Sequence, residues 1–307
     1  MNRRTLAIFA AIGATTIYGL NHTIAKGVMP DYVKPFGFIM LRVIGASILF
    51  WAISVFGPKE TIDRKDYPRM LLCAVLGMGV NMLVFFQGLA MSTPINSAVL
   101  VTITPIIVVV LSAIFIKEKI IPKKLLGIGI GFLGALILIF FSVKSRQDAP
   151  NIPLGNFLIL MNSVFYGSYL IMAKTLIAKY HPFTFMKWLF TIGILLCLPF
   201  GYQDLMAIHW PALPFEALWK IAFVVVGTTF CTYLFNIFAL TQLKASTLSA
   251  FVYVQPLIGI LYALATGQDK LTTIKILAAC LVFLGVYLAS RKPKTTNVLP
   301  SDQHGSP

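Results

Sequence analysis

The fold is decided by residues 97–124, SAVLVTITPIIVVVLSAIFIKEKIIPKK, where Pro105 interrupts an apolar run and a Glu-Lys pair ends it. The same landmarks recur in the same order 151 residues later: Pro105 as Pro256, Glu118 as Asp269 and Lys124 as Lys275. Self-similarity at a fixed period is the sequence signature of a repeated structural unit. This segment therefore predicts an internal duplication.

A second correspondence lies nearer the N-terminus. The Tyr18-Gly19 pair and Lys26 match Tyr166-Gly167 and Lys174 at an offset of 148 residues. Because the landmarks keep their order at a nearly constant offset, we interpret the chain as two diverged copies of one unit of roughly 150 residues.

The composition is that of a membrane protein. Hydrophobic residues make up 58% of the chain and charged residues 11%, which lies outside the usual range of soluble domains. Apolar runs of about 20 residues, long enough to cross a bilayer as a helix, recur throughout, and the first of them is expected to be uncleaved. The predicted class is an all-α integral membrane protein with ten transmembrane helices, at residues 5–27, 35–56, 70–91, 95–116, 122–143, 154–176, 183–203, 216–241, 246–267 and 272–290.

The net charge of +15 does not indicate nucleic-acid binding, because most Lys and Arg residues fall in loops on one predicted side. These basic segments are the N-terminus and residues 59–69, 117–124 and 291–294, whereas Lys144 and Arg146 form an exception on the other side. Cytoplasmic loops carry such an excess of positive charge. We therefore expect both termini to be cytoplasmic.

Five spans per copy is an odd number, so the two copies are expected to cross the membrane in opposite directions. The predicted domains are residues 5–143, with helices 1–5, and residues 154–290, with helices 6–10; residues 291–307 are expected to form a disordered cytoplasmic tail. Inverted repeats are typical of secondary transporters, which bind their substrate near the bilayer midplane between the two halves.

These residues resemble the EamA family of the drug/metabolite transporter superfamily. The resemblance extends over residues 5–291 and is carried by Tyr18-Gly19 with Lys26, by Pro35 with Arg42, and by Pro105 with Glu118. It implies a ten-helix bundle that exports amino acids, other metabolites or drugs through a central cavity in the inner (plasma) membrane. The sequence departs from the family pattern at Tyr18, often Trp, at Asp269, often Glu, and at Leu189, which occupies the Arg42 position in the second copy.

The ionisable side chains predicted within the spans are basic: His22, Lys26, Arg42, Lys174 and Lys187. Such residues are costly in a bilayer and often mark a transport pathway, which favours a substrate with a carboxylate or phosphate. The alternatives are that the lysines extend to the headgroups, that Arg42 pairs with a loop acid or a carbonyl, and that His22 is a packing residue.

Every acidic residue falls in a predicted loop, tail or span end, so we expect no deeply buried carboxylate. Proton-driven pumps commonly relay protons through intramembrane Asp, Glu or His. The pattern therefore indicates either that His22 serves in this role or that the protein is a facilitator or an exchanger.

Pro105 and Pro256 each remove a backbone donor in mid-span and free the carbonyl four residues earlier, so they are candidate hinges, although they could equally only shape packing. Uncharged polar residues at similar depth are either interhelical contacts or parts of a substrate site. The predicted substrate-binding residues are His22, Lys26, Arg42, Asn81, Gln87, Thr102, Tyr166, Asn236, Tyr253 and Gln255.

Residues 129–134 match the dinucleotide motif GxGxxG, but the motif lies inside a predicted span and lacks the strand and acidic residue that such a site requires. Small residues at Gly127, Gly131 and Ala135 instead predict close helix packing. We find no hydrolase or ATP-binding motif, and we expect no catalytic residue, metal or cofactor.

The sequence thus predicts a secondary transporter that exports small metabolites, amino acids or related carboxylates, by alternating access. The alternatives are broad-specificity drug efflux, a passive channel and a membrane-embedded enzyme. The expected partners are a small-molecule substrate and the lipid bilayer, without nucleic acid, and a homodimer is left open.

Overall fold

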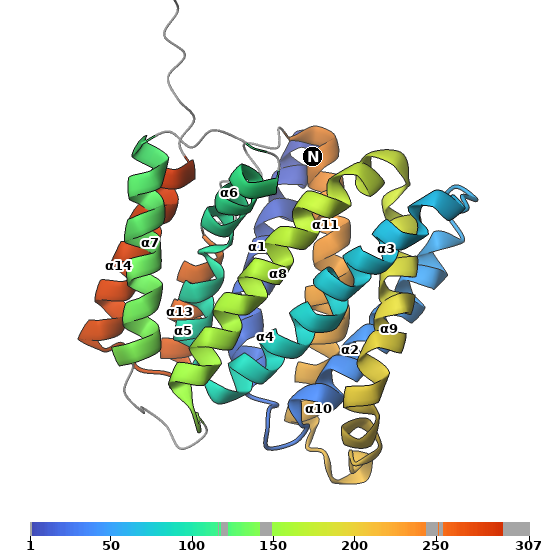
Figure 1. The fold of residues 1–307 in the computed structure, drawn as a ribbon. Helices are drawn as coiled ribbons and strands as arrows, with labels where there is room; N and C mark the ends of the chain where they lie inside the picture. Colours follow the sequence, from blue (N-terminus) through green and yellow to red (C-terminus); the bar gives the residue numbers. More distant parts are fainter. Residues whose placement is uncertain are drawn as a thin grey trace, which may run out of the picture.

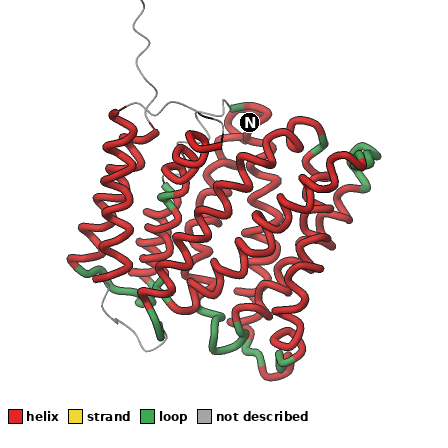
Figure 2. Tube along the Cα trace, in the orientation of Figure 1, coloured by secondary structure: helices red, strands yellow, loops and turns green. Residues whose placement is uncertain are grey.

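The computed structural model describes residues 2–115, 117, 122–141, 149–243, 251 and 254–290. Within these residues every regular element is a helix (Figure 2), and the helices cross the molecule roughly side by side (Figure 1). The helices are α1 (Arg3–Lys26), α2 (Pro35–Ser54), η1 (Arg64–Asp66), α3 (Tyr67–Ala74), η2 (Val75–Gly79), α4 (Val80–Met91), α5 (Pro94–Val101), α6 (Thr104–Phe115), α7 (Pro122–Phe141), α8 (Ile152–Lys179), α9 (Pro182–Met206), η3 (Trp210–Ala212), α10 (Phe215–Ala222), η4 (Phe223–Cys231), α11 (Thr232–Gln242), α13 (Gln255–Ala265) and α14 (Thr273–Ser290).

Seven helical segments of the described chain are long and apolar enough to cross a membrane. They lie on the predicted second to eighth spans. The 24-residue helix α1 lies on the first, and two shorter apolar helices, Gln255–Ala265 and Thr273–Ala289, lie on the ninth and tenth. The predicted helical membrane class is confirmed, and the chain is a multi-pass membrane protein.

Several helices begin where a polar side chain caps the first turn and a proline follows. Thr93 Oγ1 accepts from the backbone N–H of Asn96 at 3.4 Å, just before Pro94. Asn151 Oδ1 accepts from Leu154 N–H at 3.2 Å at the start of α8. Such side chains satisfy donors that the first helical turn leaves without a partner, and proline has no N–H to lose there.

The third and eighth spans each contain a π-helical turn. In η2 the N–H of Val80 reaches the carbonyl of Val75, and in η4 the N–H of Thr232 reaches that of Gly227, five residues earlier in both cases. The two segments start at Val75 and Phe223, which differ by the 148-residue offset of the duplication. Such turns are rare in proteins as a whole, and those that occur are often found at functional sites.

Helices from the two halves of the chain pack in pairs, α7 with α14, α2 with α9, α4 with α8 and α1 with α11. The α7–α14 pair is visible at one side of the bundle (Figure 1). It is held by small residues: a Cβ added to Gly285 would lie 2.4 Å from the backbone nitrogen of Gly131, and one added to Gly127 would lie 2.6 Å from Ala289 N. The predicted close packing at Gly127 and Gly131 is confirmed, and the GxGxxG stretch lies inside α7.

Candidate substrate site

The fourth predicted span is broken in its middle. Helix α5 ends at Val101 and α6 begins at Thr104, because Pro105 cannot donate a hydrogen bond to the preceding turn. The carbonyl of Val101, which the sequence predicted to be freed, instead accepts from Thr104 Oγ1 at 2.7 Å. Thr104 Oγ1 also lies 3.2 Å from Ser163 Oγ of α8, so the break is attached to the neighbouring helix.

The single helix expected over residues 95–116 is thus two helices. The second candidate hinge, Pro256, lies in the first turn of α13 and is buried. The adjacent Tyr253, a predicted site residue, lies outside the described residues, as does Glu118.

Arg42 extends from α2 toward η4. Its Nε donates to Thr229 Oγ1 at 2.8 Å, and its guanidinium carbon lies 5.5 Å from the centre of the Phe86 ring, which is a cation–π distance. The Thr229 hydroxyl in turn donates to the carbonyl of Val224 at 3.1 Å, within the π-helical turn. This turn therefore orients the side chain that holds Arg42.

Three predicted site residues are not fully buried. His22 and Arg42 are half-buried, and Tyr166 exposes 41% of its surface. They lie on α1, α2 and α8, and their place in a substrate site stays a prediction.

Two tyrosines pack against each other on α8. The ring centres of Tyr166 and Tyr169 are 5.7 Å apart.

His22 and Lys26 lie on the same helix but have different surroundings. His22 Nδ1 is 2.9 Å from Ser97 Oγ of α5, and its ring meets Phe85 edge-on. Lys26 is 5% exposed and donates to the carbonyl of Ala90 at 2.5 Å, so in this structure it joins α1 to the end of α4 and does not extend to the surface. Of the other two lysines, Lys174 is exposed and Lys187 lies over the Trp51 ring, 4.6 Å from its centre.

The predicted uncharged polar residues fall into two groups. Asn81 and Asn162 each donate to the other's backbone carbonyl at 3.2 Å, and Thr102 Oγ1 donates to Val99 O within its own helix. In the part of the chain that the structure describes, the amides of Gln87, Asn236 and Gln255 make no hydrogen bond. Asn81 thus acts as an interhelical contact, whereas the half-buried Gln87, Asn236 and Gln255 keep donors and acceptors for a ligand or water.

The predicted binding residues did not include Thr229 and Phe86, the two described contacts of Arg42. Thr229 corresponds to Asn81 at the 148-residue offset, so the duplication supplied a signal for it. Phe86 carried no such signal, because aromatic residues are common on packed membrane helices and only the helix rotation turns this one toward Arg42.

The expectation of no deeply buried carboxylate is wrong. The Asp269 side chain is 0% exposed, and its Oδ1 lies 2.5 Å from Nζ of Lys275, itself 3% exposed. Asp269 Oδ2 accepts from the N–H of Ile95 at 3.1 Å, at the start of α5. Helices α5 and α14 cover the loop after α13. The sequence placed Asp269 at the end of a predicted span, and that position gave no indication of this burial.

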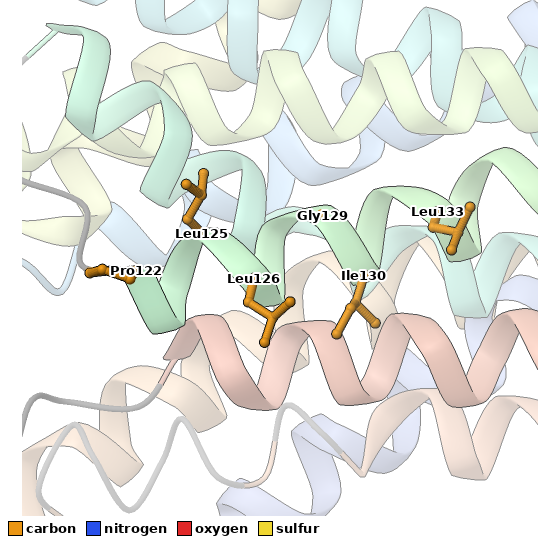
Figure 3. A pocket seen from close by; sticks show the side chains of 6 residues that line it. All are labelled: Pro122, Leu125, Leu126, Gly129, Ile130 and Leu133. Atoms are coloured by element: carbon orange, nitrogen blue, oxygen red, sulfur yellow. The ribbon is translucent and has the colours of Figure 1, made fainter.

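An apolar groove of about 510 Å³ lies on the outer face of α7. Figure 3 shows its side chains rising from this one helix. It is lined by Pro122, Leu125, Leu126, Gly129, Ile130 and Leu133. Such a lining offers a polar substrate nothing to bind and suits contact with lipid.

A multi-pass helical bundle that holds a half-buried arginine beside a hydroxyl and a ring has features that are common in transport proteins. Residues 5–140 and 153–291 each match the EamA-like transporter family, and the chain belongs to this family. The resemblance stated from the sequence is confirmed.

Similar proteins align with this chain over most of their own length and are named as transporters. An "Uncharacterized transporter" of Archaeoglobus fulgidus is 27% identical over 90% of this chain and 96% of its own length. "Uncharacterized transporter YyaM" of Bacillus subtilis is 24% identical over 91% of this chain and 92% of its own. A solved crystal structure matches the fold with a TM-score of 0.56 at 15% identity, covering 92% of this chain and 96% of that one.

Proposed function

We propose that this transporter exports small metabolites that carry a carboxylate, amino acids or related acids, across the inner (plasma) membrane. The observation that carries the proposal is Arg42: it is half-buried, and its described contacts are Thr229 and Phe86. No carboxylate among the described residues pairs with it. A buried charge requires a partner, and a substrate carboxylate can form a bidentate pair with a guanidinium.

In this proposal ten spans form two inverted repeats, both termini are cytoplasmic, and the halves rock about the central site. The helix pairing supports this arrangement. The third span of each half packs on the first span of the other, as α4 on α8 and α11 on α1, while α2–α9 and α7–α14 pair equivalent spans. A two-fold relation between the halves produces this exchange of partners.

Transport in this proposal is secondary and needs no covalent chemistry, and Gln87, Asn236 and Gln255 are the neutral groups that contact the substrate beside Arg42. A second candidate is broad drug efflux. It is favoured by the rings of Phe86, Tyr166 and Tyr169, because aromatic faces bind apolar bodies with little regard to their polar groups.

The test is untargeted mass spectrometry of the medium of cells that overexpress the chain. Parallel cultures express Arg42→Gln, Gln87→Ala and, as a control, Lys187→Gln, which removes an intramembrane cation that stacks on Trp51 instead. We expect one class of carboxylates to accumulate outside with the intact protein and with Lys187→Gln, and to be lost with the other two. Accumulation of chemically unrelated apolar compounds would favour drug efflux, and an unchanged profile in all cultures would contradict export.

A further inference from the structure

The central site contains a cation but no anion in the part of the chain that the structure describes. Every described acid lies away from Arg42. The acids with ion pairs are Asp63 and Asp66, both with Lys179; Asp204 with Lys34; Glu216 with Lys220; and Asp269 with Lys275. Glu60 accepts from the backbone N–H of His181, and Asp31 is exposed.

The broken helix does not supply the missing negative charge. Discontinuous helices of transporters often bind cations with the carbonyls of their broken ends. At the α5–α6 break these carbonyls already accept hydrogen bonds: Val99 O from Thr102 Oγ1 at 2.6 Å, Leu100 O from Ile103 N at 3.1 Å, and Val101 O from Thr104 Oγ1 at 2.7 Å. None of these three carbonyls is therefore left without a donor for a ligand ammonium to replace.

Among the described residues, the groups found near Arg42 are neutral. Phe86 covers its guanidinium, and Tyr166 and Tyr169 pack against each other on α8. Such rings accept an apolar or aromatic body. A ligand that brings one negative charge would neutralise the site, whereas a zwitterion would add an ammonium for which the described residues offer no carboxylate.

Resting on the proposed function, we infer that the site selects carboxylates with an apolar or aromatic body and no ammonium group. Hydroxy or oxo acids fit this description, and the matching amino acids do not. The desolvation of an unpaired ammonium is the physical basis of the discrimination, because a buried charge without a counter-charge is strongly unfavourable. A hydroxyl or keto oxygen in its place needs only the neutral amides of Gln87, Asn236 or Gln255.

The experiment compares two ligands that differ in this one group, 3-phenyllactate and phenylalanine, by calorimetric titration of the full-length protein in detergent micelles. We expect 3-phenyllactate to bind and phenylalanine to bind at least about tenfold more weakly. Arg42→Gln should remove 3-phenyllactate binding, and Lys187→Gln should leave it unchanged. A thermal melt of each variant shows whether it is folded, and Arg42→Lys, which keeps the charge, should retain weakened binding if Arg42→Gln does not fold.

The outcomes separate this inference from the proposed function. If phenylalanine binds as tightly as 3-phenyllactate and both depend on Arg42, the inference is overturned and carboxylate export stands. If both bind independently of Arg42, the assignment of the site to Arg42 is wrong, and both this inference and the proposed function are contradicted. If neither binds, the inferred substrate class is wrong, and the metabolite profile of the medium alone decides whether carboxylates are exported.

Discussion

Replacing Asp269 with alanine should destabilise the protein by about 3–5 kcal/mol, the usual cost of removing one partner of a buried ion pair. The side chains of Asp269 and Lys275 expose 0% and 3% of their surface and lie 2.5 Å apart. The substitution strands the Lys275 ammonium, whose remaining described acceptor is the carbonyl of Lys270 at 3.1 Å. It also removes the acceptor for Ile95 N–H at the start of α5.

The double variant Asp269→Ala/Lys275→Met should recover much of this loss, because it removes the stranded charge and fills the space with an apolar chain. The assay is reversible unfolding in mixed detergent micelles, followed by the fluorescence of the 4 tryptophans. The two single variants and the double variant form a double-mutant cycle. Two results would refute the buried-pair argument. One is a loss of stability below about 1 kcal/mol for Asp269→Ala, as for an exposed pair. The other is additivity of the two single changes.

Three further predictions concern other contacts. Lys179→Met should lower the free energy of unfolding by at most about 1 kcal/mol in the same assay, because Lys179 is 40% exposed in its pairs with Asp63 and Asp66. A larger loss would show that these three residues act as a buried network. Thr229→Val should weaken carboxylate binding about tenfold in calorimetric titration, since Arg42 Nε loses the hydroxyl that orients it; an unchanged Kd would remove Thr229 from the site. Gly285→Val should destabilise the α7–α14 pair by about 1–3 kcal/mol, because its Cβ would lie 2.4 Å from the facing backbone. The control is Gly129→Ala, where an added Cβ has nothing within 4 Å. An equal effect of both changes would contradict the packing argument.

The local elements of the fold were predictable because their signals are local. Pro105 predicted an interruption of the fourth span, and the structure divides this span into two helices. The carbonyl of Val101, predicted to be free, accepts instead from the Thr104 hydroxyl. Gly127 and Gly131 predicted close packing, and the structure shows which helix approaches them, α14. The π-helical turns were not predicted, since an inserted residue leaves the apolar pattern of a membrane helix almost unchanged.

The candidate site stays a prediction. His22, Arg42 and Tyr166 were chosen as ionisable or polar residues at membrane depth, and they are only partly buried. Asn81 met the same criterion, yet it joins two helices. The criterion does not separate these cases, because burial in a bilayer imposes the same requirement for a partner on an interhelical contact and on a ligand contact.

By itself the sequence determined the helical class, the membrane location, the duplication and the family, because apolar run length, proline position and landmark spacing are properties of the chain read residue by residue. Only the tertiary structure decided which polar groups meet. Arg42 and Thr229 are 187 residues apart, and Asp269 is buried against α5 although it lies in a loop. The physical reason is that membrane helices are apolar on most faces, so the rotation of each helix about its axis is set by packing against its neighbours.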